Sequence, residues 1–437
     1  MGNSRDRNDD DDSSMMLLLL LYISALSMGI AYGAHVPLVP VFAREVLNAT
    51  YTEVGMIGMA NYLPYAFFPF IVGLLLDRLN KGSVLLAGLS MALASIAMLS
   101  MARSVIDLAL IRALSGIAHA FFWPSAEAII SMSMRSSGYD KHGNDVSSSA
   151  ITATNKNSGS NTSNLGTVSS ISRFTMAWVS GYMVGPLIGS SLFHLGYIQL
   201  FIYSSTMTIP ALICSIILLS KYSQGSSSLN SMNRKERDKG INSSTMRLTL
   251  MSMIKDRIML IAMIMYYSAS FAILLSIVPS YMKDNGVGEQ LIGLLFFIFG
   301  IARLLTLFSI KLFASYEHIS ILIASIAIAS AMLIMYITPT SYYFGIALLA
   351  LGFAFSIYFP ITLTMLTRNV PSMMIGSMVG LYETIFGVGW ALGPVASGIV
   401  ADTFSIDAPY LAMFFVGIVI IPLYMVLHLK AGTTIAK

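Results

Sequence analysis

Charged residues and cysteine are both scarce in this sequence. Charged residues make up 11% of the chain and hydrophobic residues 56%, whereas a soluble globular domain carries roughly 25% charged residues. This scarcity excludes a soluble protein, because the chain lacks the polar groups that a water-exposed surface needs. A single cysteine, Cys214, excludes an internal disulfide bond. The composition therefore predicts an integral membrane protein.

Several motifs that carry enzyme chemistry are also missing. The sequence has no Cys-x-x-Cys or His-Glu-x-x-His pattern for a metal ion, and no Gly-x-x-x-x-Gly-Lys loop for a phosphate group. No paired catalytic residues converge within the apolar segments. We therefore expect no enzymatic activity, no cofactor, no metal ion and no nucleic-acid partner.

The apolar segments are long enough to cross a bilayer, which takes about 20 helical residues. They fall into two sets of six, at 15–40, 52–76, 83–101, 105–131, 170–194 and 197–220, and at 257–281, 289–313, 317–337, 341–366, 372–400 and 408–429. We predict an all-α integral membrane protein with twelve transmembrane helices in two six-helix bundles, 15–220 and 257–429. One chain supplies all twelve helices, so we expect a monomer in the lipid bilayer.

The distribution of lysine and arginine predicts the orientation. If the N-terminus is cytoplasmic, about twenty of the 25 basic residues lie in segments on the cytoplasmic side, and only Arg44, Arg103 and Lys283 lie on the outer side. This asymmetry predicts a multi-pass protein of the cell membrane with both termini in the cytoplasm.

Polar segments flank and interrupt the two bundles. We expect 1–14 to be a disordered cytoplasmic tail and 430–437 to be a second cytoplasmic tail. The stretch 221–256, which contains NRKERDKG, reads as a cytoplasmic linker between the bundles. Segment 136–169 is rich in Ser, Asn and Gly and is expected to be a flexible cytoplasmic loop.

A Gly-Pro element occurs twice, as GYMVGPLIG and as GWALGPVASG. Glycine and proline are both costly inside a helix, so their repetition needs a reason. Small residues four apart share one side of a helix and let two helices approach closely in lipid. Recurrence in the matching span of each half favours structural repeats that meet along glycine-lined contacts, the alternative being plain helix packing. The residues concerned are Gly181, Gly185, Pro186, Gly189, Gly389, Gly393, Pro394 and Gly398.

A second motif, GLLLDRLNKG, lies where the second span leaves the membrane. Gly73 permits close packing, and Asp77 places a carboxylate at the membrane edge. Arg78 and Lys81 anchor the cytoplasmic face. An ordinary basic loop is the alternative interpretation.

Taken together, these motifs resemble the major facilitator superfamily of secondary transporters. GLLLDRLNKG looks like its signature loop, with Asn80 where the family usually has glycine, and LALIRALSG, with Arg112 and Gly116, looks like its fourth-span motif. GYMVGPLIGS and GAHVPLVPVF resemble the fifth and first spans of the drug–proton antiporter branch. Two features depart from the family: SIKLFASYEH lacks an Asp-Arg pattern that many relatives repeat there, and 136–169 is unusually long.

This resemblance implies a mechanism as well as a fold. It implies two bundles around a central cavity, lined by spans one, four, seven and ten, which opens alternately to the two sides of the membrane. It also implies that Asp77 helps to hold one of these states by contacting the neighbouring bundle.

Ionisable residues within the spans are costly in hydrocarbon and are therefore functional candidates. They are His35, Arg112, His119, Glu127, Arg303 and Glu383. At 100° per residue, Arg112 and His119 share one helix face. Glu383 lies near mid-membrane, where burial opposes its charged form, so it could exchange protons; Glu127, nearer the inner interface, and His119 are further candidates.

Each of these candidates has a structural alternative. Arg112 could bind an anionic substrate group or control proton affinity at a nearby carboxylate, but it could also pair within its bundle. Glu383 could instead form a fixed ion pair with Arg303. Glu127 could be solvated, and His119 could be a hydrogen-bonded residue between helices.

Aromatic residues in the spans are candidates for the lining of the cavity. A mixed aromatic and methionine lining would suit a moderately apolar solute, although aromatic residues also pack or face lipid. The candidates are Tyr32, Tyr62, Tyr65, Trp123, Tyr266, Tyr267, Phe355, Tyr358 and Trp390.

From these features we expect a proton-coupled exporter of a small organic, amphipathic solute. Two bundles would rock around a central site, driven by protonation of Glu383 or, as second choice, Glu127. One alternative is an uptake symporter for a sugar, organic anion or other metabolite, in which Arg112 holds the substrate. Another is a membrane sensor or scaffold that transports nothing and recruits partners through its long loops.

Overall fold

A computed structural model describes residues 5–76, 79–139, 161–225, 257–367 and 375–434. Within these ranges the chain is helical and contains no strand. Ten of the described helical segments are long and apolar enough to cross a membrane. The helices α3 (Tyr51–Leu76) and α6 (Asn161–Leu192) complete the twelve expected spans and confirm the all-α fold class.

The first half of the chain forms one bundle, which we call the N-bundle. Besides α3 and α6 it contains α1 (Arg5–His35), α2 (Val39–Glu45), α4 (Lys81–Met98), α5 (Val105–Tyr139), α7 (Tyr197–Thr206) and α8 (Ile209–Gly225). Here α1 packs against α6 and α8, and α5 packs against α3 and α4.

The second half forms the C-bundle. It contains α11 (Ile258–Ser276), α12 (Val278–Asp284), α13 (Glu289–Phe308), α14 (Ile310–Ala314), α15 (Glu317–Ile337), α16 (Ser341–Thr367), α17 (Ile375–Thr403) and α18 (Ala408–Thr434). Here α16 packs against α13 and α15, and α11 packs against α17.

The first span of each bundle is broken at a proline. The N-bundle span changes from α1 to a 3₁₀ turn at Val36–Leu38, with Pro37 in its first turn, and continues as α2. The C-bundle span breaks between α11 and α12, with Pro279 in the first turn of α12. Proline cannot donate the backbone hydrogen bond that a continuous helix needs, so both breaks have a local cause.

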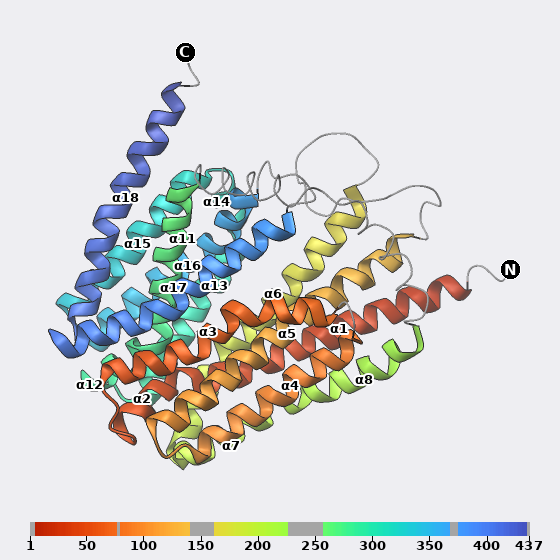
Figure 1. Cartoon of the computed structure of the whole chain (residues 1–437), viewed down its shortest axis with the longest axis horizontal. Helices are drawn as coiled ribbons and strands as arrows, with labels where there is room; N and C mark the ends of the chain where they lie inside the picture. Colours follow the sequence, from red (N-terminus) through yellow and green to blue (C-terminus); the bar gives the residue numbers. More distant parts are fainter. Residues whose placement is uncertain (1–4, 77–78, 140–160, 226–256, 368–374, 435–437) are drawn as a thin grey trace.

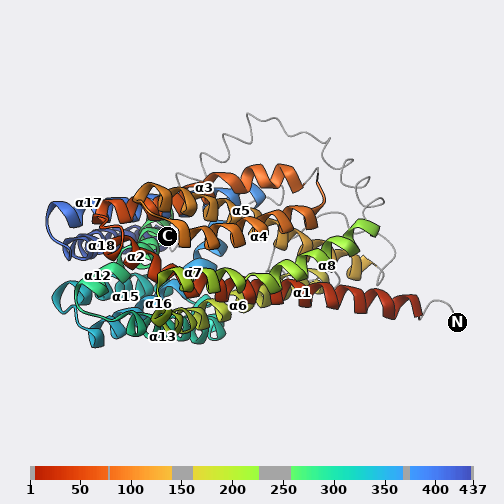
Figure 2. The ribbon, with the colours of Figure 1, turned by 90° about the horizontal axis from the view of Figure 1, so that it is seen from below.

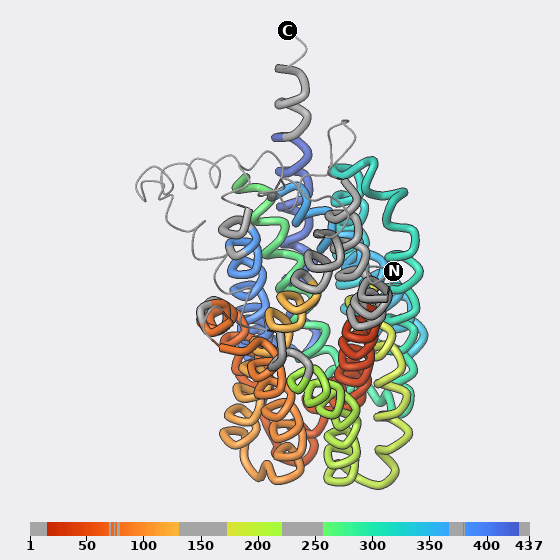
Figure 3. The backbone as a smooth tube through the Cα atoms, turned by 90° about the vertical axis from the view of Figure 1, so that its right-hand side faces the viewer, coloured from red at the N-terminus to blue at the C-terminus, as the bar shows by residue number. Residues whose placement is uncertain are grey.

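The two bundles meet near α2 and α12 and diverge towards the ends of the chain (Figure 1). In Figure 1 the N-terminal end of α1 and the C-terminal end of α18 both lie away from the meeting end. In the view turned by 90°, α1 and α8 of the N-bundle extend away from α12, α15 and α16 of the C-bundle (Figure 2). The same separation is visible along the backbone tube (Figure 3). Most of the packing between the bundles comes from two helix pairs, α3 with α17 and α6 with α13, and α2 with α12 and α3 with α11 add smaller contacts.

Several helices extend beyond their expected ends. The N-terminal tail enters α1, which begins at Arg5. Both α5 and α6 extend into the expected loop 136–169, to Tyr139 and from Asn161. Residues 140–160 and most of the expected linker lie outside the described residues. The C-terminal tail continues α18 to Thr434.

In each copy of the repeated Gly-Pro element, the glycine directly before the proline packs against a helix of its own bundle. A Cβ atom on Gly185 of α6 would lie 2.6 Å from the Cα atom of Gly33 in α1. A Cβ atom on Gly393 of α17 would lie 2.9 Å from the Cα atom of Ala269 in α11. These glycines therefore bring two helices of the same bundle together.

The prolines of the same element face the other bundle. The carbonyl group of Pro186 leaves no room for a side chain on Gly293 of α13, and that of Pro394 leaves none on Gly55 of α3. We expected the element's glycines to lie where the bundles meet, and for Gly185 and Gly393 that expectation is wrong. The carbonyl groups of Pro186 and Pro394 thus face the other bundle, whereas Gly185 and Gly393 face helices of their own bundle.

Candidate functional site

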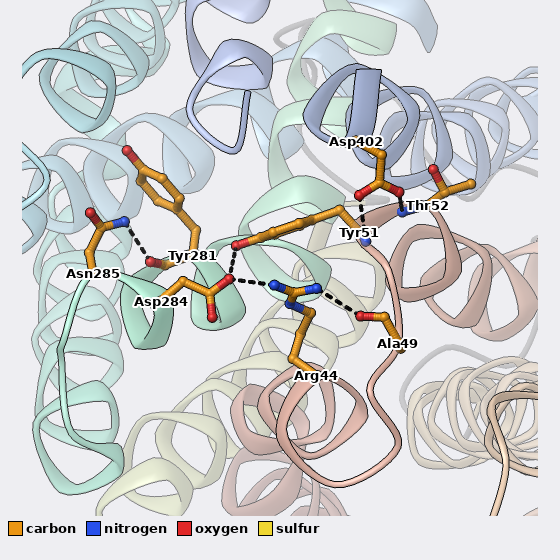
Figure 4. Close-up of polar contacts among 8 residues, drawn as sticks. All are labelled: Arg44, Ala49, Tyr51, Thr52, Tyr281, Asp284, Asn285 and Asp402. Carbon is orange, nitrogen blue, oxygen red and sulfur yellow. Dashed lines mark hydrogen bonds and ion pairs between the residues drawn. The ribbon is translucent and has the colours of Figure 1, made fainter. Parts of the chain in front are cut away.

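Polar contacts close the meeting end of the bundles (Figure 4). Arg44 of α2 donates a hydrogen bond to Asp284 of α12 at 2.8 Å and another to the carbonyl oxygen of Ala49 at 2.8 Å. The hydroxyl group of Tyr51 also donates to Asp284, at 2.8 Å, and the Arg44 guanidinium group lies 4.5 Å from the Tyr51 ring centroid. Asp284 thus holds two N-bundle side chains.

A second carboxylate crosses the same junction. Asp402, near the end of α17, accepts hydrogen bonds from the backbone N–H groups of Tyr51 at 3.0 Å and Thr52 at 2.7 Å. These groups begin α3 and have no partner within that helix, so Asp402 acts as an N-terminal cap supplied by the other bundle. We call Arg44, Tyr51, Thr52, Asp284 and Asp402 the interbundle cluster.

Lys283 adds a third connection beside the interbundle cluster. Its ammonium group lies 3.0 Å from Glu45 of α2 and also pairs with Glu289 of α13. Burial by itself would lower the pKa of Lys283, but hydrogen bonds to Glu289 and Glu45 outweigh burial and raise that pKa above its ordinary value. Lys283 therefore stays charged at neutral pH and bridges the two bundles.

We predict that Asp402→Asn weakens closure of this end. Asparagine has one carbonyl oxygen and no charge, and a hydrogen bond to a charged group is worth about 1.5–3 kcal/mol. We expect the population open at this end to rise by about tenfold, measured by spin-label distances between α3 and α17. Asp407→Asn removes a charge from the same end without crossing the junction and should change nothing. Equal distance distributions in all three proteins would contradict this role.

A polar network lies deeper in the N-bundle, around Tyr32 of α1. The Tyr32 hydroxyl group donates to Asn61 at 3.1 Å and lies 3.0 Å from the hydroxyl group of Ser115. The ring of His119 lies 4.0 Å from the Tyr32 ring, and that of His35 lies 5.1 Å from it. Arg112 lies over the same ring at 5.8 Å. The structure therefore brings together Tyr32, His35, Arg112 and His119. Arg112 and His119 were predicted to share one face of their helix, and both lie beside Tyr32.

This network leaves nitrogen atoms without a hydrogen-bond partner among the described residues. They are one terminal nitrogen of Arg112 and the Nε2 atoms of His35 and His119. The Nδ1 atom of each histidine is hydrogen-bonded to a backbone carbonyl group of its own helix, that of Ala31 for His35 and that of Ser115 for His119. Arg112 also lines a pocket between the bundles, with Val36, Val39, Pro40, Val54, Ile57, Gly58, Leu275 and Ser276.

Two carboxylates from opposite bundles face the same region. Glu127 of α5 and Glu383 of α17 interact electrostatically with each other, and both interact with Tyr65 of α3. Glu127 is exposed and Glu383 is partly exposed. Both α5 and α17 pack against α3, the helix that carries Tyr65, so the two carboxylates lie on helices that flank the junction of the bundles.

The suggested ion pair between Arg303 and Glu383 is not formed. Among the described residues Arg303 has no ion pair; it lies 5.3 Å from the ring centroid of Phe271 and 5.7 Å from that of Phe299. Tyr267 interacts electrostatically with both Arg303 and Glu383. The two residues occupy helices that do not pack face to face here, so the arginine contacts aromatic rings instead.

The aromatic candidates divide into two groups. Tyr62 reaches across the junction, with its ring 4.5 Å from that of Trp390, and Tyr65 lies 6.2 Å from the same ring. Trp390 continues to Phe386 at 4.7 Å and Phe271 at 5.5 Å. We call Tyr62, Tyr65, Phe271, Phe386 and Trp390 the aromatic seam.

Other aromatic candidates pack within a single bundle. Trp123 lies against Trp178 and Phe174 in the N-bundle. Tyr358 is fully buried in the C-bundle and bonds Ser325, and Tyr266 is buried beside α18. These three packing positions differ from the expected cavity lining. Hydropathy alone does not reveal which face of a helix turns inward.

The motif after the second span is described only in part. Asp77 and Arg78 lie outside the described residues. Lys81 donates to the backbone carbonyl of Leu76 at 3.4 Å, and a Cβ atom on Gly73 would meet nothing within 4 Å. Gly116, in contrast, packs directly against the backbone of Asn61.

Several residues of these sites were missed by the sequence analysis. Asn61, Ser115 and Tyr182 carry no charge, and nothing in their local sequence distinguishes them from packing residues. Asp284 and Asp402 had a usable signal, because each is an acidic residue at the end of a span.

Comparisons with known proteins agree with this geometry. The sequence profile of the Major Facilitator Superfamily matches residues 21–139 and 259–434. A search of curated protein sequences returns no match. A crystal structure of the nucleoside transporter NupG is similar, with a TM-score of 0.69, 14% identity, and coverage of 94% of this chain and 98% of that one.

A second similar structure is that of a POT family transporter in complex with 5-aminolevulinic acid. It has a TM-score of 0.72 and 11% identity, and the match covers 94% of this chain and 96% of that one. Identities this low support the fold alone, whereas the sequence profile spans more than half of the chain. This protein therefore belongs to the Major Facilitator Superfamily and is a secondary transporter rather than an enzyme.

Proposed function

We propose that this chain is a proton-coupled exporter of a small organic solute, as in the drug–proton antiporter branch. It acts as a monomer in the cell membrane, with both termini in the cytoplasm. The bundles rock about their junction, so that a central cavity opens alternately to the two sides.

The observation that carries this proposal is the electrostatic interaction of Glu127 with Glu383 across the junction, where α5 and α17 both pack against α3. They come from opposite bundles, so their separation depends on how far the bundles have rocked. Two like charges brought close together cannot both remain ionised at low cost. Rocking therefore changes proton affinity at this pair, which is what couples proton movement to transport.

In this orientation the interbundle cluster closes the outer side, and the structure corresponds to an inward-facing state. The basic residues Arg44 and Lys283 then serve as parts of the outer closure. Opening the outer side requires the contacts of Asp284 and Asp402 to break.

Direction of coupling is tested in proteoliposomes with an imposed pH gradient. An antiporter accumulates solute when the interior is acidic, because protons leaving the vesicle drive the solute inward. For one proton exchanged with one neutral solute, a gradient of one pH unit gives about tenfold accumulation. A thermal-shift screen of antibiotics, nucleosides, sugars and organic acids identifies a solute to use in this assay. Accumulation with an alkaline interior instead would contradict export.

An uptake symporter is the second candidate function. It is favoured by Arg112, which has an unpartnered nitrogen atom and lines the pocket between the bundles. One similar structure is a nucleoside transporter and another binds 5-aminolevulinic acid. A symporter accumulates its solute with an alkaline vesicle interior, so the same assay separates the two functions.

A further inference from the structure

Two arginine side chains lie inside the protein without a carboxylate partner. Arg112 of α5 is only 4% exposed, and Arg303 of α13 is partly buried beside the rings of Phe271 and Phe299. In the described part of the chain, neither guanidinium group forms an ion pair or donates a hydrogen bond to another residue. Their only close side-chain contacts given by the structure are with aromatic rings.

An unpaired charge away from bulk water is costly, and an arginine cannot escape that cost by losing its proton. Aromatic rings offset part of it, because their faces attract cations. The remaining unsatisfied donors include a terminal nitrogen of Arg112 and the Nε atom of Arg303. The arrangement is therefore suited to a negatively charged group that the chain itself does not provide.

Tyr182 of α6 connects the two arginines. Its backbone carbonyl group packs against Gly33 of α1, next to Tyr32, and the following residue, Met183, packs against Gly300 of α13, one turn from Arg303. Tyr182 is 7% exposed and interacts electrostatically with both arginines. Its hydroxyl group has no hydrogen-bond partner among the described residues. Three side chains from both bundles thus offer unused hydrogen-bond donors around one position near the junction.

We propose that Arg112, Tyr182 and Arg303 form the head-group site for an amphipathic organic carboxylate. The carboxylate accepts hydrogen bonds from the two guanidinium groups and the hydroxyl group, and its apolar body lies against the aromatic seam. Guanidinium groups match carboxylate geometry through paired N–H donors, which favours this chemistry over a neutral amide. An organic cation would be repelled by both arginines.

This site adds a substrate class to the proposed function. The inference rests on the proposed function in one respect, namely that the site lies on the transport path. Because the arginines lie in opposite bundles, a carboxylate bound between them would contact both bundles. Movement of the bundles would then change its contacts, as a transported substrate requires.

Binding is tested with the full-length purified protein and three probes of one shape. The probes are 4-phenylbutyrate, the neutral 4-phenylbutanamide and the cationic 4-phenylbutylamine, followed by quenching of tryptophan fluorescence and by thermal shift. Trp390 lies in the aromatic seam and reports on occupancy. We expect saturable binding of the carboxylate, with the amide and the amine at least tenfold weaker.

Variants locate the site. Arg303→Gln and Tyr182→Phe should each weaken 4-phenylbutyrate binding, by at least tenfold for the arginine and severalfold for the tyrosine. Arg303→Lys keeps the charge and should retain part of the affinity. Arg103→Gln, at an exposed position before α5, is the matched control and should bind normally. If Arg112→Gln fails to fold, Arg303→Gln and Tyr182→Phe still decide the matter.

The proposal is overturned if the three probes bind equally, if none binds, or if Arg303→Gln binds 4-phenylbutyrate as the wild type does. Its failure is distinguishable from that of the proposed function. Gradient-driven transport of a cation that is unaffected by Arg303→Gln would sustain proton-coupled export and remove the anion site. Carboxylate binding that depends on Arg303, with no response of flux to pH, would sustain the site and remove proton coupling.

Discussion

Glu383→Gln is expected to abolish accumulation driven by a pH gradient, lowering its initial rate roughly 100-fold or more. Glutamine has nearly the size of glutamate but cannot take up or release a proton, and the loss of a positioned proton carrier typically costs 10²–10⁴-fold. Glu383 is the expected carrier because it lies on a helix of the junction, α17, and interacts electrostatically with Glu127 and Tyr65. The measurement is initial uptake into proteoliposomes with an acidic interior.

A second assay separates coupling from folding and binding. Exchange of labelled for unlabelled solute at equal pH needs no net proton movement, so Glu383→Gln should retain it. Glu53→Gln makes the same chemical change at the start of α3, where the residue accepts a hydrogen bond from Thr50 and glutamine can take its place. That variant should transport as the wild type does.

Glu127→Gln tells which carboxylate carries the proton. If Glu383 is the carrier, removing the charge of Glu127 should shift the pH dependence of transport and leave accumulation possible. Complete loss in Glu127→Gln together with normal transport in Glu383→Gln would exchange their roles. Accumulation that survives in both single variants and in the double variant would rule out proton coupling through this pair.

The fold could be predicted because its determinants are local. Length and hydropathy identify each span, and the polar stretch after 220 divides the chain into halves. The breaks at Pro37 and Pro279 were not predicted, although both have a local cause. Some helix ends were predicted several residues away from their positions in the structure, because a polar helix outside the membrane has no hydropathy signal. At Tyr139 and Asn161 the helices extend into the expected loop.

Individual site residues could be predicted, but their pairings could not. An ionisable residue in an apolar span is a candidate wherever it points, so Glu127, Glu383, Arg112 and Arg303 were all identified. Which of them meet depends on how each helix is rotated and on how the bundles dock. Those properties arise from packing across the whole molecule, and for this reason the sequence could not decide whether the alternative ion pair between Arg303 and Glu383 would form.

The repeated Gly-Pro element shows the same division between local and distant determinants. The repeat itself predicted that the halves are related, and the structure places Pro186 and Pro394 in equivalent contacts with Gly293 and Gly55. The partner glycines were not predicted, because neither belongs to a recognisable motif. In each helix of this element, Gly185 or Gly393 contacts a helix of its own bundle, and the carbonyl group of the following proline contacts the opposite bundle. Contacts with both bundles therefore determine how each of these helices is rotated about its own axis.

Gly185→Ala is the second change for which we expect a large effect, here on stability. The added Cβ atom would lie 2.6 Å from both the Cα atom of Gly33 and the carbonyl oxygen of Ile30. Only backbone surrounds it, so no side chain can turn away, and the helices α1 and α6 must separate. Overpacking of a tight core costs about 1–3 kcal/mol, and we expect the upper end of that range or more, seen as a lower Tm in detergent.

Gly73→Ala is the matched control, because it makes the same change in a helix where a Cβ atom meets nothing within 4 Å. Alanine is the better helix former by about 1 kcal/mol, so this variant should be as stable as the wild type or slightly more so. A helix-propensity effect would move both variants in the same direction, whereas a packing effect moves them in opposite directions. If Gly185→Ala raised the Tm as Gly73→Ala does, α1 and α6 would not be in backbone contact, and the tight packing that orients Pro186 towards Gly293 would have to be abandoned.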